Sequence, residues 1–207
     1  MTFVISALLA ALLAPAAPKS AAEFLARRIE ERQEATPDLV ARFTQTYRSG
    51  ALGRTMVERG EVKVKRPGRM LWEYKTPEKK TFVSDGQKFY FYVPADKQVI
   101  VRDQDTARGL PALLLSGKGA VLSEFLATLE TGPPGRSRLK LVPRAPDPEI
   151  ARVFLEADES YRIRRIEVED AQGSQSAFDF DDIRENLGLT DRTFRFEIPR
   201  GVEVITG

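Results

Sequence analysis

Residues 62–99 read VKVKRPGRMLWEYKTPEKKTFVSDGQKFYFYVPADKQV, and this stretch decides the fold. Its bulky side chains Met70, Trp72 and Tyr74 recur at every second position, which is the period of a β-strand with one apolar face. The break SDG at residues 84–86 indicates a tight hairpin turn, because glycine tolerates the positive φ that such turns require. The stretch therefore predicts consecutive antiparallel strands.

The same period continues on both sides of this stretch, and an alternating run begins at Leu39. About ten or eleven short strands are predicted in all, at a spacing of roughly 8–12 residues, which is typical of an antiparallel sandwich or a barrel-like sheet. After the strand from Leu39, the predicted strands lie at about 55–65, 69–75, 80–84, 88–93, 98–101, 137–143, 151–157, 162–170, 175–184 and 193–205.

The alternation also assigns faces to the aromatic side chains. We expect Trp72 and Phe91 on one face of the sheet, with Leu71 and Tyr92 pointing to the other. Many bulky side chains on one face of a large sheet can either fill a core or line a ligand cavity, and composition does not choose between the two.

Two parts of the chain predict helices instead. Ser20 and Glu23 fit a capping box at the start of the first helix, in which the hydroxyl and the carboxylate each bond a backbone amide of the other residue. Residues 109–130 form the second part, with two short apolar helices predicted at 109–115 and 120–127. This insert is either a plug that completes an ordinary core or a cover over something held against the sheet.

Residues 1–17 are predicted to be an export signal. The apolar run Phe3–Leu13 is too short to cross a bilayer as a helix, which needs about 20 residues, and small residues after it offer a cleavage site. No basic residue precedes the run, and a short buried helix is the alternative. No cysteine follows the run, so we expect an exported protein without a lipid anchor, with residues 18–207 as a single domain.

The composition removes most catalytic chemistry. The chain contains no His and no Cys, which excludes imidazole acid–base groups, thiolate nucleophiles and thiolate zinc sites. Its 32 Lys and Arg are mixed with 30 Asp and Glu, so no basic stripe for nucleic acid is predicted. Ser137 and Lys140 match the S-x-x-K motif, but strand geometry sends the two side chains to opposite faces. The carboxylates Asp179, Asp181 and Asp182 fit a solvated strand face better than a cation site. We predict no catalytic constellation, no metal site and no cofactor.

The stretch 62–99 also carries an ordered set of residues that is specific to one family. The set is KRP at 65–67, Trp72, Pro77, VSDG at 83–86, Tyr92, Pro94 and QV at 98–99, supported by FTQ at 43–45 and the ending from Phe194 to Val202. In this set the chain strongly resembles the LolA family of periplasmic lipoprotein carriers. The resemblance covers essentially all of residues 18–207. It implies a mainly β fold, an unclosed half-barrel of about eleven antiparallel strands, with an α-helical lid over its concave apolar face.

The resemblance implies a site of apolar side chains and one arginine. The lid would be the amino-terminal helix together with the insert at 109–130. Arg66 would bond backbone carbonyls of this lid and hold the empty form closed, whereas a bare arginine in a turn is most often a solvated cation. The acyl-chain cavity would be lined by Phe43, Val62, Val64, Met70, Trp72, Tyr74, Phe89, Phe91, Leu113, Leu114, Leu115, Leu122 and Phe125.

Three functions from different classes are open. The resemblance implies a monomeric periplasmic carrier that binds the acyl chains of lipoproteins and moves them from an inner-membrane LolCDE-type ABC transporter to an outer-membrane acceptor, of the LolB type where one exists. A periplasmic lipid-binding sensor or regulatory domain on the same scaffold is the alternative. An enzyme acting on a lipid or glycan would have to work with carboxylates alone. Release of co-purified lipoprotein to acceptor membranes separates the first two.

Overall fold

The computed structural model of the protein describes residues 20–51, 53–103, 121–147 and 149–206. Within these ranges the strands form one sheet in the order β12-β6-β5-β4-β3-β2-β1-β11-β10-β9-β8-β7. The strands are β1 (Asp38–Arg48), β2 (Thr55–Lys65), β3 (Arg69–Thr76), β4 (Lys80–Ser84), β5 (Lys88–Val93), β6 (Gln98–Asp103), β7 (Phe125–Glu130), β8 (Arg136–Pro143), β9 (Arg152–Asp158), β10 (Ile163–Glu169), β11 (Gln175–Glu185) and β12 (Glu203–Thr206). The helices are α1 (Ala21–Glu34), α3 (Val121–Glu124) and the 3-10 helix η1 (Asp191–Phe194).

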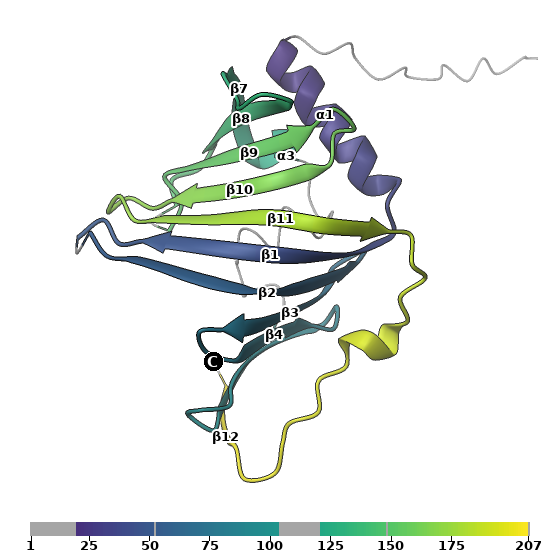
Figure 1. Cartoon of the computed structure of the whole chain (residues 1–207), viewed down its shortest axis with the longest axis vertical. Coiled ribbons are helices and arrows are strands. Elements are labelled where there is room, and N and C mark those ends of the chain that lie inside the picture. Colours follow the sequence, from purple (N-terminus) through teal and green to yellow (C-terminus); the bar gives the residue numbers. More distant parts are fainter. Residues whose placement is uncertain (1–19, 52, 104–120, 148, 207) are drawn as a thin grey trace, which may run out of the picture.

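The sheet curves into a barrel that does not close, because β7 and β12 stand at its two edges (Figure 1). All pairs among β1–β11 are antiparallel, whereas β12 pairs with β6 in parallel. The predicted half-barrel of about eleven antiparallel strands is confirmed, with β12 as one further strand. No helix in the described ranges is long and apolar enough to span a membrane.

Strand register sorts the side chains into an inner and an outer face. Val62 of β2 lies opposite Trp72 of β3, Trp72 lies opposite Phe82 of β4, and Phe82 lies opposite Phe91 of β5. Residues directly opposite each other in neighbouring strands share a face. These apolar side chains therefore lie on one side, which we call the inner face.

Helix α1 covers part of the inner face beside β7 and β8. The Ser20 half of the predicted capping box is confirmed, since the Ser20 hydroxyl accepts a hydrogen bond from the Glu23 amide at 3.1 Å. Leu25 and Ile29 point from the helix into the same hydrophobic cluster as the inner side chains of the strands. The amphipathic helix is thus held by packing against the sheet as well as by its cap.

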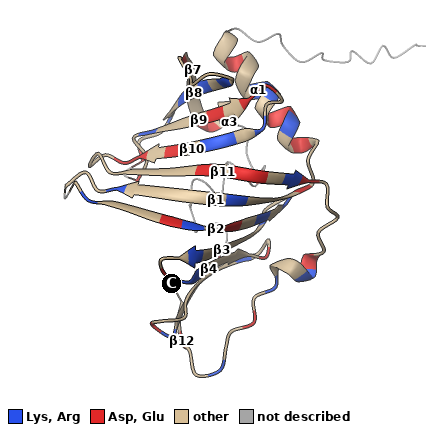
Figure 2. Ribbon diagram, viewed as in Figure 1, with Lys and Arg blue, Asp and Glu red and all other residues tan. Residues whose placement is uncertain are grey.

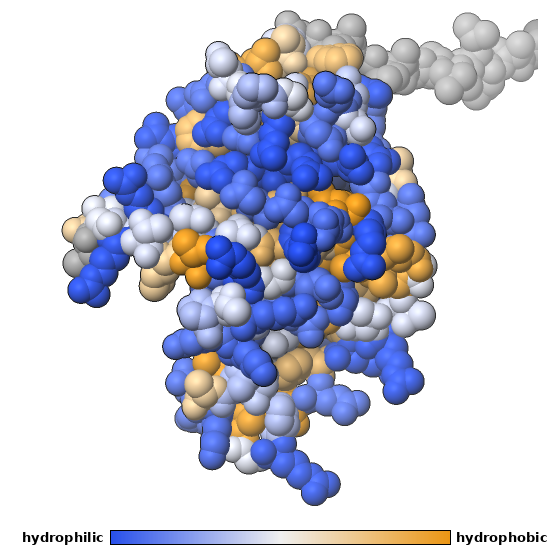
Figure 3. All heavy atoms as spheres, in the orientation of Figure 1, coloured by the Kyte–Doolittle hydropathy of each residue, from blue (hydrophilic) through white to orange (hydrophobic). Residues whose placement is uncertain are grey.

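Charged side chains dominate the outer face (Figures 2 and 3). Both blue and red residues lie along β9, β10 and β11 in Figure 2, and ion pairs join β8 to β9 and β10 to β11. The three aspartates near the end of β11 each contact a different arginine: Asp179 contacts Arg165, Asp181 contacts Arg164, and Asp182 contacts Arg42. Such exposed pairs stabilise the protein little, but they keep this face hydrophilic.

The predicted strand at 193–205 is wrong for most of its length. The segment after β11 leaves the sheet, forms η1 and crosses the outer side near β3, before only Glu203–Thr206 return as a strand. Phe194 is fully buried there, and the Phe196 ring lies 5.3 Å from that of Tyr90 and 5.7 Å from that of Tyr92. The alternating phenylalanines imitate a strand pattern, but here they pack on the outer face of strands that already exist.

The helix predicted at 120–127 is also wrong in its second half. Only Val121–Glu124 are helical, and Phe125–Glu130 form β7, so the predicted helical insert at 109–130 ends early. The reason is pairing: β8 offers β7 a ladder from Phe125 opposite Pro143 to Glu130 opposite Arg138. Residues 109–120 lie outside the described residues, as do residues 1–17 with the predicted export signal.

Candidate functional site

The inner face carries a continuous aromatic floor formed by β1, β3 and β11. The Phe43 ring lies edge-on to Trp72 at 5.0 Å and to Tyr74 at 4.8 Å between ring centroids. Trp72 in turn meets Phe178 at 5.5 Å and Phe180 at 6.1 Å, also edge-on. All five side chains are buried. Edge-to-face contacts of this kind add about 0.5–1.5 kcal/mol per pair beyond burial of the area itself.

The floor requires a glycine in β2. Gly60 pairs with Phe43 across the strands, and a Cβ atom at this position would lie 2.7 Å from two carbons of the Phe43 ring and 2.1 Å from the Glu73 carbonyl oxygen. The ring therefore lies over bare backbone. No motif in the sequence signals this role.

Towards β4 and β5 the floor becomes more open. Phe82 stacks on Phe91 with centroids 4.2 Å apart and an interplanar angle of 18°, and it lies 5.8 Å from Phe89. These three rings are only half-buried. As expected, Trp72 and Phe91 lie on the inner face, whereas Leu71 and Tyr92 belong to the opposite side.

The structure brings together most of the residues that the sequence suggested for a cavity wall. Phe43, Val62, Val64, Met70, Trp72, Tyr74 and Phe125 are buried in one cluster, with Leu122 packed against it. Leu113, Leu114 and Leu115 lie outside the described residues. Phe82, Phe178 and Phe180 belong to the same face and were missed, although the alternation of Phe178 and Phe180 with aspartates was a signal for them.

Helices α1 and α3 are tied to each other above this cluster. The Leu122 amide donates to the Glu30 carboxylate at 3.4 Å, and Arg144 Nε donates to the Leu122 carbonyl at 3.2 Å. These two hydrogen bonds link α1, α3 and the segment after β8, whereas the contact of both helices with the inner face is apolar.

Arg66 lies at the junction of α1 with the sheet. Its Nη1 donates to the Thr36 carbonyl oxygen at 2.5 Å, and its backbone amide donates to the Pro37 carbonyl at 2.8 Å. Thr36 lies two residues beyond the last residue of α1, and its hydroxyl donates back to the Arg32 carbonyl in the last turn. Within the described residues, Arg66 thus bonds the segment that follows the carboxyl end of α1, and α1 is one part of the lid that the sequence suggested.

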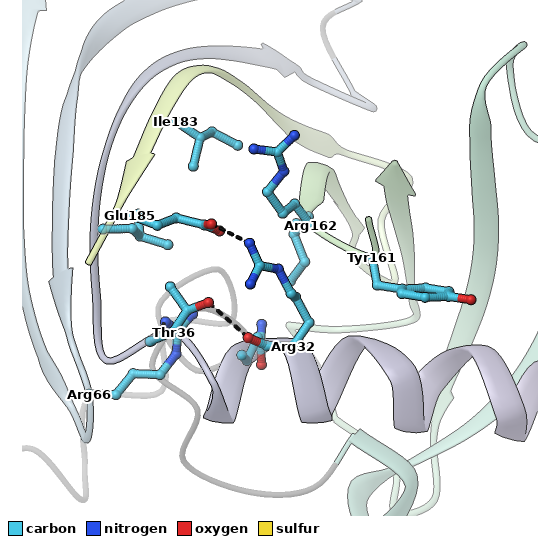
Figure 4. A pocket seen from close by; sticks show the side chains of 10 residues that line it. Arg32, Thr36, Arg66, Tyr161, Arg162, Ile183 and Glu185 are labelled. Atoms are coloured by element: carbon cyan, nitrogen blue, oxygen red, sulfur yellow. Dashed lines mark hydrogen bonds and ion pairs between the residues drawn. The ribbon is translucent and has the colours of Figure 1, made fainter. Parts of the chain in front are cut away.

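A small pocket opens beside this arginine, lined by the ends of α1, β1, β10 and β11 (Figure 4). In it the Arg32 guanidinium points at the Glu185 carboxylate and forms an ion pair. Burial lowers the pKa of Arg66 to about 10, the Glu185 carboxylate opposes this effect, and the Arg32 guanidinium adds to it. The side chain remains charged at neutral pH, so the site holds a partly buried cation, and the Glu185 carboxylate that acts on it is also paired with Arg32.

Fold and site together define a class: unclosed antiparallel barrels with an apolar inner face under helices, suited to apolar ligands. Residues 34–197 match the family model described as "Outer membrane lipoprotein carrier protein LolA". The chain belongs to this family.

Two relatives agree with this assignment, and one solved structure shares the fold. An outer-membrane lipoprotein carrier protein of Chromohalobacter salexigens is 35% identical over 181 residues, covering 87% of this chain and 86% of the relative. One of Hahella chejuensis is 33% identical over 170 residues, covering 80% of each. An uncharacterized conserved protein from Thermus thermophilus shares the fold, with a TM-score of 0.59 at 13% identity, over 91% of this chain and 100% of that one.

Proposed function

We propose that this protein is a periplasmic carrier that holds the acyl chains of lipoproteins against its inner face. The observation that carries the proposal is the aromatic floor, which is continuous across β1, β3 and β11 and has α1 packed on the same cluster. The family and its named relatives support it.

The chemistry of such cargo requires a face of this kind. Each acyl methylene buried from water stabilises the complex by about 0.8 kcal/mol, so a chain of about 15 methylenes resists exposure by on the order of 10 kcal/mol. A carrier must therefore cover the chains during transit. An empty carrier must also cover its own floor, which α1 does in part through Leu25 and Ile29.

Loading would displace this cover, and Arg66 is placed to control the displacement. Its bond to Thr36 attaches the segment just after α1 to the turn between β2 and β3. Loss of that side-chain bond would loosen this attachment, while the bond from the Arg66 backbone amide to the Pro37 carbonyl would remain and act as the pivot. The arginine would thus act as a latch that favours the empty, covered form.

The partners of the carrier follow from its task. The cargo would come from an inner-membrane ABC transporter and pass to an outer-membrane acceptor. Transfer of co-purified lipoprotein from the purified protein to acceptor membranes tests this route. Stable retention of the lipoprotein in the presence of acceptor would contradict it.

The binding face is tested by a matched pair of substitutions on β5. Phe91 and Tyr92 are neighbours, both half-buried, and they point to opposite faces. Phe91→Asp should abolish lipoprotein binding because it places an unpaired charge in the apolar wall, whereas Tyr92→Asp should retain binding. Trp72→Asp should also abolish it.

The measurement is mass spectrometry of lipoprotein that co-purifies with each folded variant from the periplasm, with displacement of a fluorescent lipid probe as a second readout. Equal binding by the Phe91 and Tyr92 variants would overturn the assignment of the face.

A further inference from the structure

A row of polar side chains crosses the inner face beside the aromatic floor. It spans five neighbouring strands, and the register places all of its members on the same face as Phe43 and Phe178. The polar row consists of Lys80 on β4, Tyr74 on β3, Glu58 on β2, Gln45 on β1 and Ser176 on β11.

The members of the row are linked to one another. Lys80 Nζ donates to the Glu58 carboxylate at 2.7 Å and lies 4.4 Å from the centre of the Tyr74 ring. The Tyr74 hydroxyl donates to Gln45 Oε1 at 2.7 Å, and Gln45 Nε2 donates to the Ser176 hydroxyl at 2.9 Å. Burial, and then the Glu58 charge, raise the pKa of Tyr74, so its hydroxyl stays a donor at neutral pH.

The row lies at the boundary between buried and exposed parts of the face. On one side of it are the buried rings of Phe43 and Trp72. On the other side Met56 pairs with Tyr47, and Met56 is 57% exposed. The side chains of Lys80 and Glu58 are 23% and 15% exposed, so they remain within reach of a ligand.

The row has hydrogen-bonding capacity left. An ammonium group carries three N–H donors, and within the described residues Lys80 donates one side-chain hydrogen bond, to Glu58. A side-chain amide carries two N–H donors, and Gln45 has one such bond, to Ser176. Hydrogen-bond donors at the edge of the aromatic floor suit a ligand whose acceptor atoms are attached to apolar chains.

We propose that the polar row binds the ester and amide carbonyl oxygens that join acyl chains to the amino terminus of a lipoprotein. This inference rests on the proposed carrier function. Carbonyl oxygens taken out of water without a donor are costly, and they sit at the head of each acyl chain. When the chains lie on the aromatic floor, their carbonyls would reach the row, which thereby sets how deep the chains enter.

Two double substitutions test the row against a matched control. Lys80→Met with Glu58→Gln removes the charged donor and leaves no orphaned carboxylate. Lys63→Met with Glu73→Gln makes the corresponding change on the outer face, where Lys63 Nζ lies 3.0 Å from the Glu73 carboxylate. Lys63 also lies 3.3 Å from the carboxylate of Glu61, which keeps Lys75 at 4.0 Å as a second partner. Urea unfolding establishes that each variant is folded.

Two probes separate carbonyl recognition from general apolar binding. The first is a dipalmitoylated cysteinyl peptide, which has ester carbonyls, and the second is 1-N-phenylnaphthylamine, which has none. The inner double variant should bind the peptide about tenfold more weakly or worse, as expected for a lost bond to a charged donor, and should bind the naphthylamine within about twofold of the parent. The outer double variant should match the parent with both probes.

The outcomes distinguish this inference from the proposed function. A parent protein that binds neither probe contradicts the carrier proposal itself. A parent that binds both, with an inner variant that binds the peptide equally well or loses both probes alike, overturns the polar row as a carbonyl site. Ser176→Ala, which removes one hydroxyl, keeps the test available if the inner double variant does not fold. Its expected loss is about threefold for the peptide alone, and no loss overturns the proposal.

Discussion

Replacing Arg66 by leucine should produce a carrier that loads lipoprotein but hands it over poorly. Within the described ranges the side chain donates one charged hydrogen bond, from Nη1 to the Thr36 carbonyl at 2.5 Å, and Thr36 is only 2% exposed. A hydrogen bond from a charged donor contributes about 1.5–3 kcal/mol. Its loss would shift the equilibrium between the covered and the displaced positions of α1 by roughly 10- to 150-fold towards the displaced, loaded form.

The effect on overall stability should be smaller than this bond suggests. Burial lowers the pKa of Arg66 to about 10, which means that desolvation of the guanidinium outweighs its attraction to Glu185. Leucine removes the bond and the desolvation penalty together. We therefore expect the free energy of unfolding of Arg66→Leu to stay within about 1 kcal/mol of the parent, so a transfer defect would not reflect a damaged fold.

The assay is transfer from purified, loaded carrier to acceptor membranes, compared for Arg, Lys and Leu at position 66. Lysine keeps the charge but lacks the rigid fork of donors, so it should fall between the other two. Arg69→Leu is the control, because Arg69 is the first residue of β3, directly after the same turn, and its side chain contacts Asp191 at 3.5 Å. Equal loading and release by all variants would refute the latch.

Three further predictions concern the scaffold of the site. Asp38→Ala should lower the free energy of unfolding by about 2–4 kcal/mol in urea titrations. The reason is that the Asp38 carboxylate accepts hydrogen bonds from the backbone amides of three consecutive residues, beginning at Leu187, at 2.7–3.1 Å. A loss below about 0.5 kcal/mol would contradict this prediction. Gly60→Ala should cost about 1–3 kcal/mol and weaken lipid-probe binding, since the new Cβ atom meets the Phe43 ring, and parent-like stability would show that the ring has room to move. The hydrogen bond from Lys65 and the nearby arginines lower the pKa of Asp191 below its usual 3.8. The contribution of Asp191 to stability is therefore complete above pH 3.8 and is lost as the pH falls through its lowered pKa. Asp191→Asn should remove this part of the acid dependence of unfolding, and a variant with the pH profile of the parent would contradict the prediction.

Local patterns were enough to predict most of the strands and their faces. A strand turns its side chains to alternate sides whatever it packs against, so the spacing of Trp72 and Tyr74 determined that they share a face, and Leu71 the other. The cap at Ser20 is equally local, because its partner Glu23 is three residues away. The family resemblance of residues 62–99 predicted that the barrel is unclosed, which the alternation of side chains alone does not indicate.

Other features depend on neighbours that are distant in the chain. Residues 125–130 fit a helix or a strand by pattern, and the free edge of β8 decided for the strand. Likewise, the alternation from Phe194 predicted a strand, but the outer side of the sheet offered these rings a place to pack.

The features of the candidate site likewise fall into those that the sequence determines and those that depend on the tertiary structure. The sequence by itself determined which side chains are apolar and which face each one takes, because both follow from residue type and strand period. Only the tertiary structure decided that Arg66 bonds Thr36, thirty residues earlier in the chain, and that Lys80, Glu58 and Gln45 form one row. Hydrogen bonds act over about 3 Å between particular atoms, and which atoms come that close is set by the curvature and order of the whole sheet.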